Sequence, residues 1–257
     1  MLEKDKKNCL FDAHFHIFDV QKYQSLSDLW SDFQKNDYFY TGMTCAYTKE
    51  QWFLQKKLCD SSSNFDNIKL YKGIGIHPWY LDESLIPFID QLAKDDSLDF
   101  IGEIGLDYYT PELKSTRKLQ VELFYKQLQM AIQYSKGVVI HSRKAFDDIL
   151  TFSNELKKIP YVIFHSFDGG VSQTEALIRR GINVYFSFGS SILKKSKKAL
   201  ECVKNLPVNR LLTETDAPFQ PLKGESFLPV QAIISITKEI SELNPLFCNN
   251  SPSFLFN

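Results

Sequence analysis

Two features are missing from this 257-residue sequence: a cysteine framework and a long apolar run. The five cysteines are odd in number and form no Cys-x-x-Cys pair, which disfavours a disulfide scaffold and a thiolate zinc site. The amino-terminal segment Met1–Cys9 is charged, and no later stretch is long and apolar enough to cross a membrane. We therefore expect a cytoplasmic protein with no membrane-spanning segment.

The sequence also has no excess of either charge, since 30 Lys and Arg residues face 31 Asp and Glu residues. A protein that coats duplex nucleic acid is usually basic, so extended non-specific binding to DNA is not indicated. The lysines at 194, 195, 197 and 198 are expected to form a solvated helix face. An enzyme that grips only one end of a polyanion would need no global positive field. Nothing in the composition predicts a protein partner.

Proline-rich linkers, low-complexity tracts and a G-x-G-x-x-G motif are absent as well. What the sequence does contain is eight short, nearly continuous apolar runs separated by helical patterns. The expected strands are Cys9–Ala13, Tyr38–Ala46, Ile68–Ile76, Phe100–Ile104, Val138–Ile140, Tyr161–Phe164, Asn183–Phe186 and Arg210–Thr213. Alternating strands and helices form parallel units, and eight such units close into a (β/α)₈ TIM barrel. We predict one domain over residues 1–257, with a doubly wound open sheet as the alternative.

Short patterns predict where some helices begin and end. Thr110 is followed by a proline and a glutamate, which is typical of an N-cap and an acidic first turn. The dipeptides Lys136-Gly137 and Arg180-Gly181 each precede an expected strand. A basic last turn followed by a glycine is the usual end of a helix, so both glycines are expected to end helices.

The histidines all fall at or just beyond the ends of expected strands. They are His14, His16, His77, His141 and His165. In a parallel barrel the carboxyl ends of the strands converge on one face, where active sites are built. We therefore expect these side chains to meet in a single mouth.

The segment Asp12-Ala13-His14-Phe15-His16 contains the closest pair of histidines. Side chains on a strand alternate between faces, so Asp12, His14 and His16 are expected to point one way. Two imidazoles on one face can chelate one cation such as zinc, nickel, manganese or iron. Two buried, hydrogen-bonded histidines are the alternative for this pair taken alone. The other strand-end histidines and two matching carboxylates favour the metal site.

Those carboxylates are Glu103 and Asp216. Glu103 follows an apolar run, where an unpaired carboxylate would be costly and a metal would neutralise it. Its two oxygens could bridge two cations. Asp216 alone is compatible with a turn before Pro218, but at the end of the eighth strand it could also face the metals and take a proton from water. Glu214 competes for that role.

These motifs, taken together, resemble the TatD family of metal-dependent hydrolases and deoxyribonucleases. The resemblance covers nearly the whole chain and is carried by six blocks in the family's order, namely Asp12–His16, Gly75–Pro78, Gly102–Asp107, His141–Arg143, His165–Gly169 and Glu214–Pro218. It implies an amidohydrolase-like barrel with two divalent metal ions, Mg²⁺, Mn²⁺ or Zn²⁺. By the same resemblance, the first metal would be held by His14, His16, Glu103 and Asp216. The second would be held by Glu103, His141 and His165, while His77, Asp107 and Arg143 would contact substrate.

The activity that the resemblance implies is cleavage of phosphodiester bonds from DNA ends, as a 3′-5′ exonuclease acting on single strands. A metal-activated water would attack, with Asp216 as general base and Glu103 as the bridging catalytic carboxylate. Arg143 would pair bidentately with a phosphate. Two alternatives remain: a related barrel hydrolase acting on an amide, lactone or ester, and a metal-binding protein without turnover. Many amidohydrolases use a carboxylated lysine where Glu103 stands, which favours the TatD-like branch.

The chain departs from the family pattern in two places. The segment before Pro229 lacks the Arg-Asn pair that many members carry there. The tail from Asn244 to Asn257 is short and irregular, where members usually have a regular final helix. Both departures concern substrate grip near the barrel mouth, because every ligand position is intact.

Overall fold

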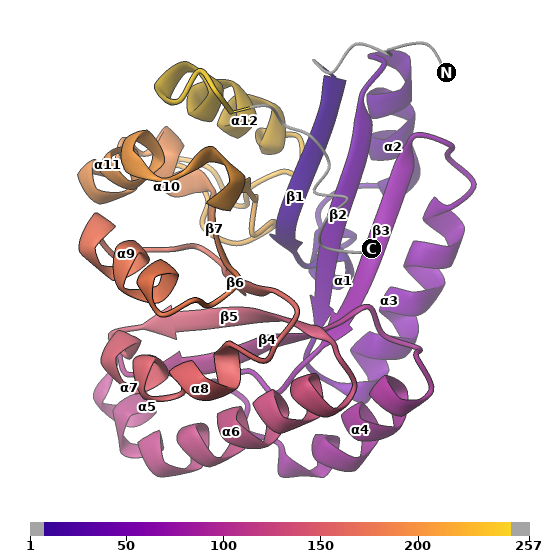
Figure 1. The fold of residues 1–257 in the computed structure, drawn as a ribbon. Helices are drawn as coiled ribbons and strands as arrows, with labels where there is room; N and C mark the ends of the chain where they lie inside the picture. The colour runs from indigo at the N-terminus through magenta and orange to yellow at the C-terminus, as the bar shows by residue number, and fades with distance from the viewer. Residues whose placement is uncertain (1–7, 248–257) are drawn as a thin grey trace.

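The computed structural model describes residues 8–247, which form eight parallel strands hydrogen-bonded in sequence order (Figure 1). The strands are β1 (Cys9–Phe15), β2 (Phe39–Ala46), β3 (Ile68–Ile74), β4 (Phe100–Asp107), β5 (Gly137–Arg143), β6 (Val162–Phe164), β7 (Val184–Phe188) and β8 (Leu211–Thr213). Every expected strand is present, with boundaries shifted by a few residues. Cys248 and most of the tail from Asn244 to Asn257 lie outside the described residues.

The sheet curves until its last strand meets its first. Beyond β8, the backbone N–H of Asp216 donates to the His14 carbonyl at 2.9 Å, and that of His16 donates to the Ala217 carbonyl at 2.8 Å. The result is a nearly closed (β/α)₈ barrel, which confirms the predicted fold and rules out the open sheet.

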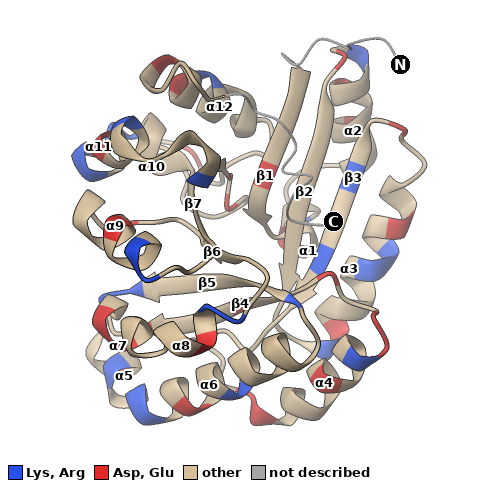
Figure 2. Ribbon diagram, in the orientation of Figure 1, with Lys and Arg blue, Asp and Glu red and all other residues tan. Residues whose placement is uncertain are grey.

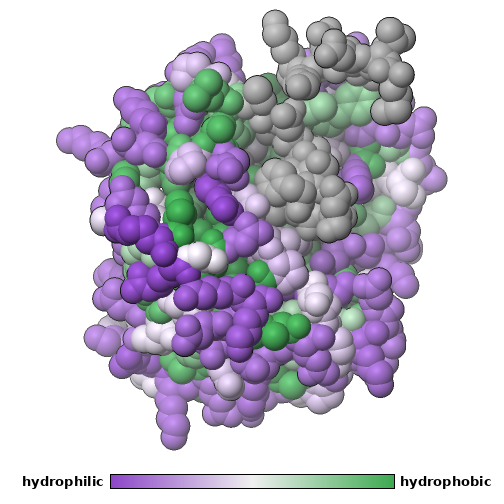
Figure 3. Space-filling model, in the orientation of Figure 1, coloured by the Kyte–Doolittle hydropathy of each residue, from purple (hydrophilic) through white to green (hydrophobic). Residues whose placement is uncertain are grey.

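Helices surround the barrel and connect successive strands (Figure 1). They are α1 (Ile17–Val20), α2 (Leu26–Lys35), α3 (Lys49–Ser62), α4 (Ile86–Lys94), α5 (Pro111–Ser115), α6 (Arg117–Gln133), α7 (Phe146–Thr151), α8 (Ser153–Leu156), α9 (Val171–Arg179), α10 (Ser190–Leu193), α11 (Lys197–Asn205) and α12 (Ala232–Leu243), with 3₁₀ turns at Glu83–Leu85 and Val208–Arg210. Within residues 8–247, none of them is long and apolar enough to cross a membrane. The outer surface in Figure 3 is mostly hydrophilic, as expected for helices that bury one face.

The apolar core has an inner and an outer part. One cluster fills the barrel itself with side chains from nearly every strand, including Phe11, Ala13, Met43, Phe100 and Ile163. Two larger clusters lie between the sheet and the surrounding helices. The inner cluster closes the lower barrel, so polar side chains can gather only at the carboxyl ends of the strands.

The first strand contains an irregularity that the alternating pattern did not predict. Its pairing with β2 shifts register between Asp12 and Phe15. Ala13 belongs to the inner cluster, yet the next side chain, His14, also points inward and lies 3.5 Å from Cys45. The Asp12 carboxylate instead accepts hydrogen bonds from the N–H and the hydroxyl of Thr215 and from the hydroxyl of Tyr40. The expectation that Asp12 shares a face with His14 is wrong, because the register shift interrupts strict alternation.

Two of the three helix-boundary predictions are confirmed. The Thr110 hydroxyl accepts a hydrogen bond from the N–H of Leu113 at the start of α5, and Gly181 has a φ of 75° just after α9. Gly137 does not end a helix but is the first residue of β5. A side chain there would meet the Tyr161 ring at 2.1 Å, so packing rather than a helix stop requires this glycine.

Buried glutamines on the helices tie down the strand ends. Gln127 on α6 accepts a hydrogen bond from the N–H of Ile76 at 2.6 Å and donates to the carbonyl of the same residue. Gln120, about two turns earlier on the same helix, holds Asp107 in the same way, at 2.8 and 3.0 Å. Gln55 on α3 donates to the Gly73 carbonyl. Each amide side chain satisfies backbone groups at the place where a strand stops.

Candidate metal centre

Six polar side chains from five strands converge at the carboxyl end of the barrel, and all of them except His14 line one cavity. The cavity has a volume of about 520 Å³. The converging residues, all less than 9% exposed, are His14, His16, Glu103, His141, His165 and Asp216. They come from the ends of β1, β4, β5, β6 and β8, so closure of the barrel brings them together from 203 residues of sequence (216 minus 14, plus one).

The first group of donors surrounds His14. The Nε2 atom of His14 lies 3.1 Å from Nε2 of His16, 3.2 Å from Oε2 of Glu103 and 3.7 Å from Oδ1 of Asp216. His16 Nε2 lies 3.4 Å from the same Asp216 oxygen. Four donors about 2.0–2.2 Å from a shared ion in a tetrahedral site would be roughly 3.3–3.6 Å apart. These separations therefore suit a single small cation.

The second group lies on the other oxygen of Glu103. Oε1 of Glu103 is 2.9 Å from Nδ1 of His141 and 2.6 Å from Nε2 of His165. The two imidazole nitrogens are 3.3 Å apart. Glu103 thus presents one oxygen to each group, as a bridging carboxylate would.

The hydrogen bonds of His141 show which of its nitrogens is available. Nε2 lies 2.9 Å from Oδ2 of Asp107, so this nitrogen carries a proton and donates to the carboxylate. Nδ1 lies 2.9 Å from Oε1 of Glu103. Burial opposes a charge on this ring, but the hydrogen bonds to Asp107 and Glu103 outweigh burial and raise the pKa of His141, so without a cation Nδ1 carries a proton and donates to Glu103. With a divalent ion bound, Nδ1 would lose that proton and offer its lone pair. A lone pair facing a carboxylate oxygen is unfavourable unless a cation lies between them. Imidazole and carboxylate donors are those that a divalent metal ion prefers, so the residues present fit the metals that the sequence predicts.

Electrostatics keep the carboxylates ionised and His14 neutral. Burial raises the pKa of Glu103, but the surrounding histidines, His165 first, hold it well below its usual range. Burial also raises the pKa of Asp216, but the hydrogen bond from His16 and the nearby histidine charges outweigh burial, so this pKa is lowered too. Burial, with His165 nearby, lowers the pKa of His14 to about 4. Ionised carboxylates and neutral imidazoles are the forms that bind metal. Burial lowers the pKa of His165, but the charge of Glu103 outweighs burial and raises it to about 10, so a divalent cation would displace a proton from His165 when it binds.

His77 also contacts Glu103, but it does so through a protonated ring nitrogen. Its Nδ1 accepts a hydrogen bond from the N–H of Trp79 at 3.1 Å, so the proton is on Nε2. That Nε2 lies 3.2 Å from Oε1 of Glu103 and donates to it. Although His77, Glu103 and His141 are close enough to form a metal group, this tautomer has no free lone pair for a metal. His77 lines the cavity as a hydrogen-bond donor.

Asp107 is not placed as the sequence suggested. It has no exposed surface and does not line the cavity. Its oxygens accept hydrogen bonds from Nε2 of His141, from the indole N–H of Trp79 at 2.9 Å and from the N–H of Tyr109 at 2.8 Å. Asp107 therefore lies behind His141 and positions it, and the predicted contact with substrate does not fit this burial.

Asp216 and Glu214 occupy different surroundings. Asp216 lines the cavity, and its Oδ2 accepts a hydrogen bond from Nε2 of Gln220 at 2.6 Å. Glu214 is completely buried, and its carboxylate accepts hydrogen bonds from the N–H and hydroxyl of Ser166 and the hydroxyl of Ser187. Since all these donors fix Glu214 in the wall, Asp216 is the better candidate for a base.

Comparison with known proteins identifies the family. A family model described as "TatD related DNase" matches residues 11–247. The chain belongs to the TatD family. An uncharacterized metal-dependent hydrolase, YabD, from Bacillus subtilis is 32% identical over 185 residues, which cover 69% of this chain and 71% of that protein. The human 3′-5′ RNA nuclease TATDN2 is 27% identical over 245 residues, 90% of this chain and 30% of that protein.

The fold of this TatD family member is also similar to that of a solved relative. The crystal structure of YjjV, a TatD homologue from Escherichia coli, superposes with a TM-score of 0.78 at 24% identity and covers 96% of this chain and 98% of that one. The likeness extends over the entire barrel, so the strand ends that carry the candidate ligands belong to a shared architecture.

The mouth of the cavity combines one cation with exposed rings. The Arg143 guanidinium lies 4.0 Å from the centre of the Tyr109 ring and forms no ion pair with a carboxylate among residues 8–247. Trp79 and Tyr80, which line the cavity, are both about half exposed. In the segment before Pro229, Phe227 stacks on Tyr23 with ring centres 4.9 Å apart. Among residues 8–247, Arg143 is the only arginine that lines the cavity.

Some residues of the site gave no signal in the sequence analysis. Gln220 bonds both Asp216 and the Ser166 hydroxyl at 2.7 Å, and a polar residue four positions after the candidate base was the only clue to it. Asp12, predicted to face the metals, anchors Thr215 instead and so holds the turn that presents Asp216. Tyr47 stacks on Tyr80 at 4.6 Å and completes the cavity wall.

Proposed function

We propose that this chain is a divalent-metal-dependent deoxyribonuclease that removes nucleotides from the 3′ ends of single-stranded DNA. The observation that carries the proposal is the bridging position of Glu103 between two groups of buried imidazole donors, with Asp216 beside the first group. The family description names DNase activity, which supports DNA as the substrate. The human relative is named as a 3′-5′ RNA nuclease, so it supports the direction of cleavage but not the choice of DNA.

Each metal would have its own donor group. His14, His16, Glu103 and Asp216 would hold one divalent ion, and Glu103, His141 and His165 the other. Two such ions, once bound, would supply Lewis acidity that lowers the pKa of a water molecule and neutralises charge on phosphate oxygens. Mg²⁺, Mn²⁺ and Zn²⁺ are the candidates.

The protein itself would move the proton and orient the phosphate. Asp216 is ionised and has one oxygen directed toward His16 while Gln220 fixes the other, so its orientation is set before substrate arrives. It would take the proton of the attacking water as general base. Arg143 would pair with a phosphate oxygen, since its guanidinium has no competing carboxylate among the described residues. The N–H of His77 would keep Glu103 in place.

The charge at the mouth favours a phosphodiester over an amide, lactone or ester. Those neutral substrates would leave the Arg143 guanidinium without an anionic partner. The cavity of about 520 Å³ is closed below by the apolar barrel interior, so it admits the end of a strand more readily than a continuous duplex. A purely structural metal site would need no carboxylate placed and oriented like Asp216.

The test is a substrate panel given to the metal-loaded enzyme. We expect stepwise shortening of a single strand labelled at its 5′ end, no cleavage of closed single-stranded circles, and little turnover of amides or lactones. An RNA strand of the same sequence distinguishes DNA from RNA preference. Rapid nicking of circles would exclude end-directed cleavage. Turnover confined to amides or lactones would overturn the phosphodiesterase assignment.

A further inference from the structure

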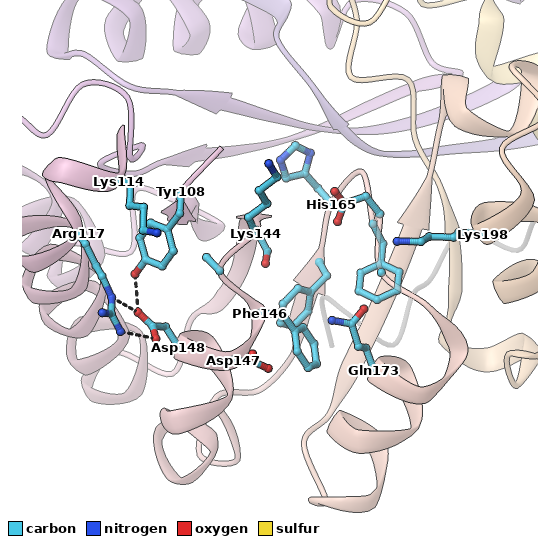
Figure 4. Close-up of a pocket in the computed structure, with 16 residues that line it drawn as sticks. Tyr108, Lys114, Arg117, Lys144, Phe146, Asp147, Asp148, His165, Gln173 and Lys198 are labelled. Carbon is cyan, nitrogen blue, oxygen red and sulfur yellow. Dashed lines mark hydrogen bonds and ion pairs between the residues drawn. The ribbon is translucent and has the colours of Figure 1, made fainter. Parts of the chain in front are cut away.

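A second pocket adjoins the catalytic cavity on the side of β5 and β6. It has a volume of about 540 Å³ and is bounded by α5, the segment after β5, the segment after β6 and α11 (Figure 4). Four residues line both cavities, namely Ser142, His165, Phe167 and Asp168. A chain-like molecule bound in the catalytic cavity can therefore continue into the second pocket without leaving the protein surface.

The second pocket is lined by lysines that have no anionic partner. Lys114, Lys144 and Lys198 come from three separate segments, and none forms an ion pair within residues 8–247. Figure 4 shows Lys114 and Lys198 on opposite sides of the pocket. Figure 2 shows basic residues on α5, on α11 and just beyond the tip of β5, the side to which β4 and β5 point.

Only two of the three aspartates that line the pocket have a carboxylate free to offset the lysine charges. Asp148 is already bound by Arg117, with two contacts of 2.7 Å, and by the Tyr108 hydroxyl. Asp147 and Asp168 remain as free carboxylates. Three unpaired ammonium groups against two unpaired carboxylates leave a net positive pocket, which suits a single phosphate rather than a highly charged polyanion.

A line of cations joins the two cavities. Arg143 lines the catalytic cavity and Lys144 lines the second pocket, and both lie over the same Tyr109 ring, at 4.0 and 4.7 Å from its centre. Arg143 is the last residue of β5 and Lys144 follows it with a φ of 52°, so the two cations mark the boundary between the cavities. The Phe146 and Phe167 rings line the second pocket and offer apolar surface beside it.

We propose that the second pocket binds the next phosphate of the DNA strand, on the 5′ side of the bond being cleaved. This subsite rests on the proposed function and extends it: Arg143 holds the scissile phosphate, while Lys144 and Lys198 hold the one before it. The lysines act on binding of longer strands and take no part in the chemical step, since they are outside the catalytic cavity.

The experiment compares the double variant Lys144→Gln/Lys198→Gln with a matched control, Lys197→Gln/Lys204→Gln. The control removes the same charge from the same region, and neither of its lysines lines either cavity. The two substrates are a short oligothymidylate and p-nitrophenyl thymidine 5′-phosphate. The second substrate has one phosphodiester and no preceding phosphate, so it cannot reach the second pocket.

We expect kcat/KM of the pocket variant on the oligothymidylate to fall about tenfold, through KM, with a shallower salt dependence. Its activity on the p-nitrophenyl ester should equal that of the wild type, and the control should match the wild type on both. Equal losses on both substrates, an unchanged oligothymidylate KM, or an equal loss in the control would overturn the subsite.

Binding separates failure of this subsite from failure of the proposed function. If the wild type cleaves neither substrate, the deoxyribonuclease assignment fails on its own. Fluorescence anisotropy with a labelled oligothymidylate still decides the pocket. A tenfold weaker affinity of the pocket variant alone supports it, and equal affinities of wild type and variant contradict it.

Discussion

The two adjoining cavities of this barrel are built in opposite ways. In the catalytic cavity the polar groups are fixed by other protein atoms, as Asp107 fixes His141 and Gln220 fixes Asp216. In the second pocket, Lys144 and Lys198 end in ammonium groups with no ion-pair partner among residues 8–247. Chemistry needs donors held within fractions of an ångström, whereas a grip on a flexible strand needs charge that can follow it. Single substitutions should therefore be severe in the first cavity and mild in the second.

The largest effect is expected from Glu103→Ala, which removes the carboxylate shared by both donor groups. Activity should fall beyond about 10⁴-fold, since both sources of Lewis acidity are lost together. Metal content by elemental analysis should fall with it. Chelation of the wild type should have the same effect, and Mg²⁺, Mn²⁺ or Zn²⁺ should restore the wild type but not the variant. Full wild-type activity after exhaustive chelation would contradict the metal requirement.

The next effect separates Asp216 from its neighbour. Asp216→Asn should lower kcat about a thousandfold, because the amide cannot accept the proton of water. Metal should still bind through Glu103, His141 and His165. The matched variant Glu214→Gln should cost far less, since Glu214 does not line the cavity. A greater loss for Glu214→Gln than for Asp216→Asn would move the role of base to Glu214.

A smaller effect is expected behind the metal centre. Asp107→Asn keeps the size of the side chain but weakens its acceptance of the His141 N–H. Metal affinity should fall about 10–100-fold, as is usual when a residue supporting a ligand is changed. Isothermal titration of the metal-free protein measures it directly, and thermal unfolding checks that the barrel is intact. Unchanged affinity would return Asp107 to the substrate-contact role expected from the sequence.

Most of the fold could be predicted because its signals are local. Apolar runs marked all eight strands, and the strand-end positions of the histidines placed them at one face. The ligand distances agree with the two donor groups that the family resemblance implied. The prediction that Gly137 ends a helix was wrong because glycine is needed there to leave room for the Tyr161 ring. That contact joins residues 24 apart in sequence, so no local pattern shows it.

What the sequence could not show depends on contacts made across the barrel. The register shift in β1 turns Asp12 toward Tyr40 and Thr215, and no alternating pattern reveals such a shift. Asp107 accepts a hydrogen bond from the Trp79 indole, 28 residues away in sequence, and no local pattern reveals that contact. The lysines at 194–198 were expected to form one solvated face, but they diverge: Lys195 pairs with Glu239, while Lys198 lines the second pocket.

The paired bonds from α6 to the ends of β3 and β4 have a consequence for binding energetics. Two glutamines on this helix hold the strand ends, Gln127 at Ile76 and Gln120 at Asp107. Because of these bonds, His77 and the carboxylate that positions His141 are already ordered when the barrel folds. The conformational entropy of that ordering is lost once, during folding, and not again at each encounter with substrate. Free energy released by binding is therefore left for the transition state, and α6 contributes to turnover without touching any reacting atom.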